Sequence, residues 1–139
     1  MKSFQYAIFV GLIILAACSS KHKEDTDNDE WAAMDTFHML MAEAYHPFKD
    51  SANLAPARAG AEELAQGAAV FASAELPEKV NNDDVRNQLD DLRNSARAFA
   101  DEVKQNAPDS VISKDLTALH EKFHHITEAW HKEEEEHQR

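Results

Sequence analysis

Residues 111–134 read VISKDLTALHEKFHHITEAWHKEE, and their apolar side chains recur at steps of three and four residues. This spacing puts them on one face of an α-helix. The members of the row are Ile112, Leu116, Leu119, Phe123, Ile126 and Trp130. The stretch therefore predicts a helix that buries one face in a core.

Two upstream rows follow the same spacing. The first consists of Trp31, Met34, His38, Met41, Tyr45 and Phe48. The second consists of Val85, Leu89, Leu92, Ala96, Phe99 and Val103. Between them, a shorter and alanine-rich helix is marked by Leu64, Ala68 and Phe71. Because the sequence lacks alternating apolar strands, the predicted fold class is all-α.

Prolines and capping residues divide these rows into separate helices. Pro56 stands where a helix can begin, and Pro77 and Pro108 follow helices in polar connections. The run Asn81-Asn82-Asp83-Asp84 offers capping side chains and negative charge to the helix that follows it. The predicted helices span residues 30–53, 56–75, 83–106 and 111–134.

The connections between these helices are short, and short connections make successive helices antiparallel neighbours. The sequence therefore predicts an antiparallel up-down-up-down four-helix bundle over residues 30–139, with enough apolar residues for one core. Pro47 is the irregularity. It should kink the first helix or end it near His46.

The first 17 residues are typical of a targeting signal. Lys2 supplies a positive start, an apolar run covers residues 6–15, and small residues follow at Ala16 and Ala17. The apolar run is short for a membrane-spanning helix. We therefore predict a signal peptide over residues 1–17.

Leu15-Ala16-Ala17-Cys18 resembles a bacterial lipobox, in which the cysteine becomes the lipidated first residue of the mature chain. The alternative is an ordinary signal peptide with a chance cysteine. Ser19 follows the cysteine. In bacterial lipoproteins, an aspartate at this position is the usual signal for retention in the inner membrane. The resemblance thus implies a lipid on Cys18 and an outer-membrane anchor facing the periplasm, with residues 18–29 as a polar, flexible tether.

Charge and cysteine content exclude two classes of protein. The formal net charge is −12, and removal of the leader with its one charged residue, Lys2, leaves about −13. Such a chain has no basic stripe for nucleic acid and weakly favours cations or basic partners. Cys18 is the single cysteine, so a Cys-x-x-Cys-His haem attachment, and with it a c-type cytochrome, is excluded.

Histidines flank the apolar rows of the first and last helices. His120 and His124 are four residues apart, which puts both imidazoles on one helical face. Viewed down the last helix, His120, His124 and His131 are rotated by roughly +80° to +120° from the centre of the apolar row. In the first helix, His38 and His46 are rotated by roughly +60° and +140° from the centre of its apolar row. In one bundle handedness these flanks close onto one seam. In the other they point to opposite sides.

We predict His38, His46, His120 and His124 as ligands of a zinc or copper ion, because imidazole suits both ions and no thiolate is available. His38 and His46 are separated by about 12 Å of helical rise, so both one shared site and two smaller sites remain open. The alternative is that these histidines bind no metal. They are then partly buried side chains that hydrogen-bond to neighbours, and His46 caps the end of the helix. Three histidines are assigned to solvent: His22, His125 and His137.

Other potential ligands lie near these histidines. Met34, Met39 and Met41 are all in the first helix. Core packing explains Met34 and Met41, and thioether ligation of Cu(I) is the functional alternative. Four carboxylates could hydrogen-bond to the imidazoles and orient them. They are Asp35, Glu43, Glu121 and Glu128.

The arrangement is similar to small periplasmic four-helix proteins, which include b-type cytochromes and metal-sensing or metal-trafficking proteins. In the cytochromes, a methionine of the first helix and a histidine of the last bind haem iron. Met34 or Met41 with His120 or His124 match that pair, but the surplus of histidines departs from it. The leading hypothesis is a non-enzymatic envelope lipoprotein for metal buffering, delivery or sensing. The alternatives are a haem b electron carrier and a metal-free structural or interaction lipoprotein.

Overall fold

The computed structural model describes residues 31–137, and side chains as far as Lys132. The predicted leader, the tether, Cys18 and His22 lie outside the described residues, as does the side chain of His137. The helices are α1 (Ala32–Ser51), α2 (Ala55–Ala59), α3 (Ala61–Ser73), the 3₁₀ turn η1 (Glu78–Val80), α4 (Asp83–Lys104) and α5 (Asp109–His137). The all-α prediction is confirmed for this part of the chain.

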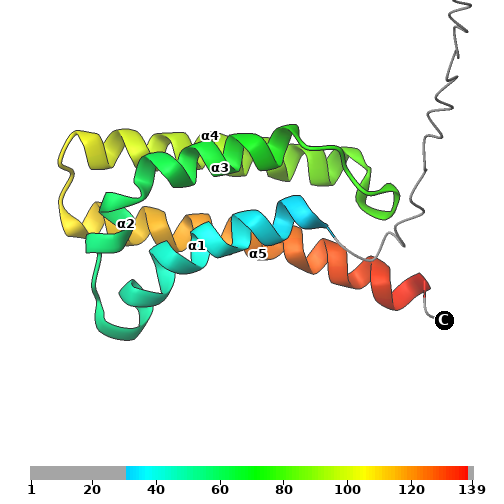
Figure 1. The fold of residues 1–139 in the computed structure, drawn as a ribbon, viewed down its shortest axis with the longest axis horizontal. Coiled ribbons are helices and arrows are strands. Elements are labelled where there is room, and N and C mark those ends of the chain that lie inside the picture. Colours follow the sequence, from blue (N-terminus) through cyan, green and yellow to red (C-terminus); the bar gives the residue numbers. More distant parts are fainter. Residues whose placement is uncertain (1–30, 138–139) are drawn as a thin grey trace, which may run out of the picture.

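The four long helices form two pairs, with α1 beside α5 and α3 beside α4 (Figure 1). The pairs pack on each other, since α1 also contacts α3 and α4 also contacts α5. The short helix α2 lies at one end and links α1 to α3. Each long helix therefore buries its apolar face against two neighbours.

The predicted single helix over residues 56–75 is wrong, because the chain forms two helices that meet at Gly60. The ψ angle of Gly60 is 4°, far from the α-helical value of about −42°. Glycine is a weak helix former, so this departure costs little there. Pro56 lies in the first turn of α2, as the sequence predicts.

Of the two effects expected of Pro47, an end of the helix near His46 does not occur, and α1 agrees with the helix predicted over residues 30–53. α1 continues through Pro47 to Ser51. The Ser51 hydroxyl donates a hydrogen bond to the Pro47 carbonyl oxygen at 2.9 Å. The helix ends where Ala52 takes a left-handed conformation, with φ 54°, and its N–H donates to the Phe48 carbonyl oxygen at 2.7 Å.

The capping run before α4 behaves as predicted. The N–H of Val85 donates to the side-chain oxygen of Asn82 at 2.9 Å, which satisfies one of the free donors in the first turn. Asp83 and Asp84 lie in that turn, where their negative charge interacts favourably with the helix dipole.

The core follows the predicted rows of α4 and α5. Every member of the α5 row is buried, as are the first five residues of the α4 row, whereas Val103 is partly buried. The α1 row needs a correction, because the buried residues of that helix are Met34, Phe37, Met41 and Ala44. His38 is exposed rather than at the core edge. The larger apolar area of Phe37 explains why this residue faces inward.

An aromatic cluster connects three of the long helices. The ring of Phe71 on α3 lies 5.6 Å from Phe37 on α1 and 6.3 Å from Phe123 on α5, between ring centroids. Phe37 and Phe123 lie 5.3 Å apart. Trp31 extends the cluster, with centroid distances of 5.0 Å to Phe71 and 5.6 Å to Trp130. These contacts set the spacing between α1 and α5.

Ion pairs join the helices at the surface. Arg97 on α4 donates to both carboxylate oxygens of Glu62 on α3, at 2.8 and 2.7 Å. Arg58 on α2 donates to the Ala107 carbonyl oxygen at 2.8 Å and to Asp109 at 2.6 Å. The second pair connects α2 to the start of α5.

We expect Phe71→Ala to lower the free energy of unfolding by about 3–5 kcal/mol, because it leaves a cavity among the aromatic rings. Val70→Ala is the control, since Val70 is 66% exposed, and its effect should stay within about 0.5 kcal/mol. Urea denaturation of the full chain measures both. Equal effects of the two substitutions would contradict this description of the core.

Candidate metal centre

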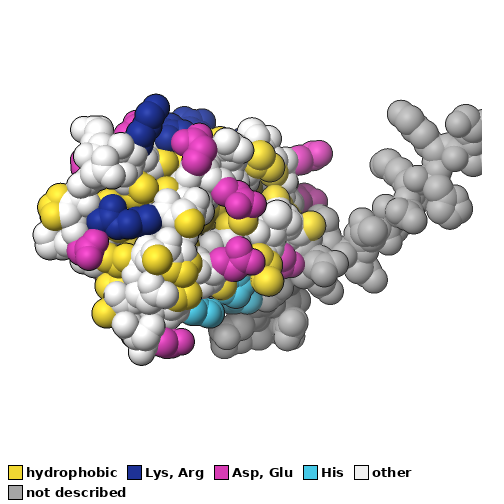
Figure 2. All heavy atoms as spheres, turned by 60° about the vertical axis from the view of Figure 1, so that its left-hand side comes forward, with side chains coloured by type: hydrophobic (Ala, Val, Ile, Leu, Met, Phe, Trp, Pro, Cys, Tyr) yellow, Lys and Arg dark blue, Asp and Glu magenta, His cyan; other side chains and the backbone are white. Residues whose placement is uncertain are grey.

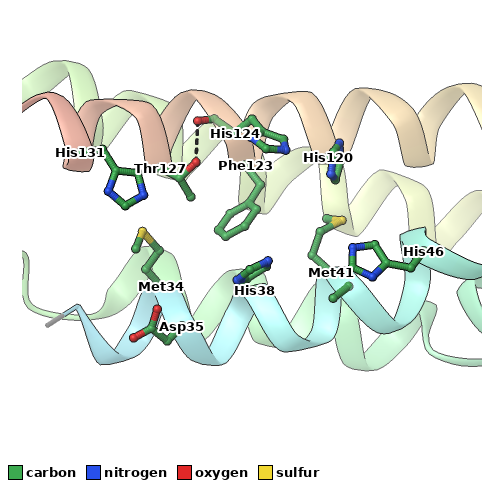
Figure 3. Close-up of a pocket in the computed structure, with 11 residues that line it drawn as sticks. Met34, Asp35, His38, Met41, His46, His120, Phe123, His124, Thr127 and His131 are labelled. Carbon is green, nitrogen blue, oxygen red and sulfur yellow. Dashed lines mark hydrogen bonds between the residues drawn. The ribbon is translucent and has the colours of Figure 1, made fainter. Parts of the chain in front are cut away.

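A groove of about 280 Å³ runs between α1 and α5. Five histidines line it: His38 and His46 from α1, and His120, His124 and His131 from α5. Figure 3 shows the two sets facing each other across the space between the helices. The packing of α1 beside α5 therefore brings the two histidine flanks to one seam.

All four histidines predicted as ligands thus lie on the same groove, while their role as ligands stays a prediction. His38, His46 and His124 are exposed at its mouth, and His120 is half-buried. In the space-filling view, the histidines visible on that face gather in one area, with acidic side chains nearby (Figure 2). The groove is thus open to a solvated cation.

His120 and His124 form the closest pair of imidazoles. Their ring centroids are 4.4 Å apart at an interplanar angle of 75°. One helical turn separates them, so both rings project from the same face of α5. His38, across the groove, packs against Phe123 with a centroid distance of 5.6 Å. Hence Phe123 forms the floor between the two histidine sets.

Tyr45 of α1 orients His120. The two rings are stacked, with centroids 3.7 Å apart and an interplanar angle of 12°. Tyr45 and His120 come from different helices, so this stack is a direct α1–α5 contact beside the groove. It limits how far the His120 ring can turn.

The surroundings of His120 favour its neutral form. Burial is the largest cause that lowers its pKa from 6.5 to about 4, followed by the positive charges of His124, Lys49, His46 and His38. A neutral imidazole keeps a nitrogen lone pair free for a metal ion. His120 is therefore ready to bind metal at pH values where an ordinary histidine is protonated.

The histidines do not form a preassembled ligand set. Within residues 31–132, no three His, Asp or Glu side chains are placed together so that they could hold a metal ion. His120 and His124 supply two nitrogens, and a third protein ligand would require a side-chain rotation across the groove. Such rotations are fast for exposed residues, and His38, His46 and His124 are exposed.

The groove also contains residues outside the predicted ligand set. His131 lies seven residues beyond His124 and lines the same wall. Its position on the same helical flank as His120 and His124 is the sequence feature that could have identified it. The thioethers of Met34 and Met41 line the opposite wall. Tyr45 was predicted only as a core residue, and nothing local in the sequence indicates its stack on His120.

Four Glu-x-x-His pairs, the spacing of di-iron bundles, occur in the sequence. They are Glu43–His46, Glu121–His124, Glu128–His131 and Glu134–His137, and the side chains of the last pair lie outside the described residues. In the first two pairs the histidine lines the groove and the glutamate does not. Glu43 and Glu121 line other hollows of the surface. Glu128 lies 3.6 Å from the exposed His125.

Asp35 is therefore the one carboxylate of the four flanking residues that lines the groove. Such a carboxylate can accept a hydrogen bond from an imidazole or attract a cation. The site is thus rich in imidazole and poor in carboxylate, which distinguishes it from a di-iron centre.

Comparison with known proteins finds no matching family model, no matching curated protein and no matching solved structure. Among the described helices, α1 to α5, none is long and apolar enough to cross a bilayer. The chemistry of the groove is therefore the observation on which a functional proposal can rest.

The lowered pKa of His120 predicts a pH-dependent stability. Between pH 6.5 and about 4 the unfolded chain binds a proton at His120 that the folded chain does not, so stability falls as pH drops through this window. His120→Phe preserves a ring stacked on Tyr45 and removes the titration. Urea denaturation at pH 7 and pH 4.5 should show a smaller loss for the variant than for the wild type. Equal losses would show that His120 titrates normally.

Proposed function

We propose that the chain is a lipid-anchored cell-envelope protein that binds a zinc or copper ion between α1 and α5. The observation that carries the proposal is the lining of one groove by histidines of both helices. The proposed ligands are His38, His46, His120 and His124. Imidazole nitrogen suits both ions, and the acidic chain, with a formal net charge of −12, attracts cations.

In this proposal His120 and His124 form the anchoring half of the site. Their four-residue spacing lets two imidazoles reach one ion from a single helix. His46 or His38 adds a nitrogen from α1, so that the ion bridges the two helices. Because the α1 ligand has to rotate into place, binding should be reversible and should reduce the motion between α1 and α5.

The role proposed is buffering, delivery or sensing of the metal rather than catalysis. A mouth of exposed histidines allows an ion to enter and leave without opening the core. A protein that sequesters or hands over metal needs this exchange. We therefore regard the chain as a binding protein and not as an enzyme.

The proposal also includes the anchor and the helix directions. Cys18, in the lipobox-like run, would carry the lipid, and residues 18–29 would connect it to the domain at the periplasmic face of the outer membrane. An up-down-up-down order of the long helices is supported by the short segments between them. Residues 105–108, for example, connect α4 to α5, which favours antiparallel neighbours.

Haem b is the second candidate, because Met34 and Met41 lie across the groove from His120 and His124. The groove volume of about 280 Å³ lies just below the range of roughly 300–1,000 Å³ for sites of drug-sized ligands. A planar macrocycle would thus require α1 and α5 to move apart. A bare ion needs no such movement, so it is the favoured ligand. An absent Soret band after haemin addition removes the haem alternative.

Zinc titration of the full chain, purified without a histidine tag, tests the metal proposal. His120→Ala combined with His124→Ala should weaken zinc binding by more than about tenfold, since two ligands are lost. His125→Ala is the matched control, because His125 is on the same helix but exposed outside the groove. Equal zinc affinity of all three proteins, or no binding to the wild type, rejects the proposal and leaves the metal-free alternative.

The anchor is tested separately by Cys18→Ser. Without the acceptor thiol, labelled palmitate should not be incorporated into the chain. A wild-type chain that incorporates no lipid would show that Cys18 is a chance cysteine behind an ordinary signal peptide.

A further inference from the structure

Two of the methionines of α1 face the histidines of α5. Met34 and Met41 are seven residues apart, so they project from the same side of the helix at two levels of the groove. Figure 3 shows the Met34 sulfur directed toward the side of His131 and the Met41 sulfur directed toward the side of His120. Each thioether therefore lies on the wall opposite an imidazole.

The third methionine of α1 behaves differently. Met39 is 64% exposed and does not line the groove, whereas Met41 is 1% exposed. Core packing alone explains a buried methionine. Met41, however, lies on the wall of a histidine-lined groove with its sulfur directed into the groove. The thioether can therefore also act as a metal ligand.

Thioethers change which ion the groove favours. Thioether sulfur is a soft ligand that suits Cu(I), whereas zinc is bound in proteins by thiolates, imidazoles and carboxylates. The chain has one cysteine, Cys18, which lies outside the described residues. Met34 and Met41 are therefore the soft donors that the groove offers.

The burial of the groove's inner side chains also favours Cu(I) over zinc. Phe123 at the floor of the groove and Met41 on its α1 wall are almost fully buried, and moving charge into such surroundings is costly. That cost is smaller for an ion of charge +1 than for one of charge +2. A neutral thioether also needs no compensating charge when buried. A monovalent soft ion thus fits this floor better than a divalent one.

We propose that the groove selects Cu(I), with the Met41 thioether and the His120 imidazole as ligands at one end and the Met34 thioether and the His131 imidazole at the other. This inference rests on the proposed function, specifies its ion, and replaces the four-histidine ligand set by two Met–His pairs for Cu(I). The two thioethers supply the donors that the histidines alone do not assemble. Two Cu(I) sites also agree with the separation of Met34 and Met41 by two helical turns.

Matched methionine variants of the full, tag-free chain test the inference. Cu(I) is titrated anaerobically against a colorimetric chelator, and zinc chloride is titrated in parallel. Met34→Leu combined with Met41→Leu should lower Cu(I) affinity by about tenfold or more and change zinc affinity by less than about twofold. Met39→Leu should change neither. Leucine conserves the side-chain volume, and circular dichroism confirms that the variants fold.

X-ray absorption at the copper edge gives a second readout. The wild-type Cu(I) complex should show a sulfur neighbour that disappears in the double variant. If zinc binds but the double variant keeps wild-type Cu(I) affinity, or if no sulfur neighbour is detected, the copper(I) inference fails and the proposed function stands. If neither ion binds to the wild type, both fail.

Discussion

The packing of Phe37 against Phe71 and Phe123 is the contact on which the rest of the structure depends. It joins α1, α3 and α5 and holds the first and last helices at a fixed spacing. The histidines lie on the outer edge of this contact, and Phe123 is both part of the core and the floor of the groove. Stability and the candidate site therefore share one element, and a change in the aromatic cluster would move the histidine walls.

Local information in the sequence predicted much of the fold. The three- and four-residue spacing marked α1, α4 and α5, because helical periodicity is a property of neighbouring residues. The break at Gly60 was missed, and the effect of Pro47 was left open between a kink and an early helix end, since each depends on whether the surroundings tolerate a weak helix former. The inward face of α1 was assigned through His38 instead of Phe37. That choice is made by Phe71 and Phe123, which are distant in sequence.

The candidate site was likewise predictable only as far as local spacing determines it. Spacing placed His120 and His124 together, but two bundle handednesses were open, and only the long-range packing decides between them. The stack of Tyr45 on His120 and the position of Met41 opposite His120 depend on that packing too. Burial of His120 and the charges of its neighbours, led by His124, lower its pKa, and the same packing directs the Met41 sulfur into the groove. The proposed metal chemistry therefore follows from the meeting of two helices rather than from a sequence motif.

The central claim is that one metal-binding groove takes ligands from both α1 and α5. Nuclear magnetic resonance of the histidine ring nitrogens during a zinc titration tests it most directly, because each imidazole reports its own coordination. The account predicts that His38 or His46 shifts at the same zinc-to-protein ratio as His120 or His124. Shifts confined to the α5 histidines, or no shifts on either helix, would contradict it.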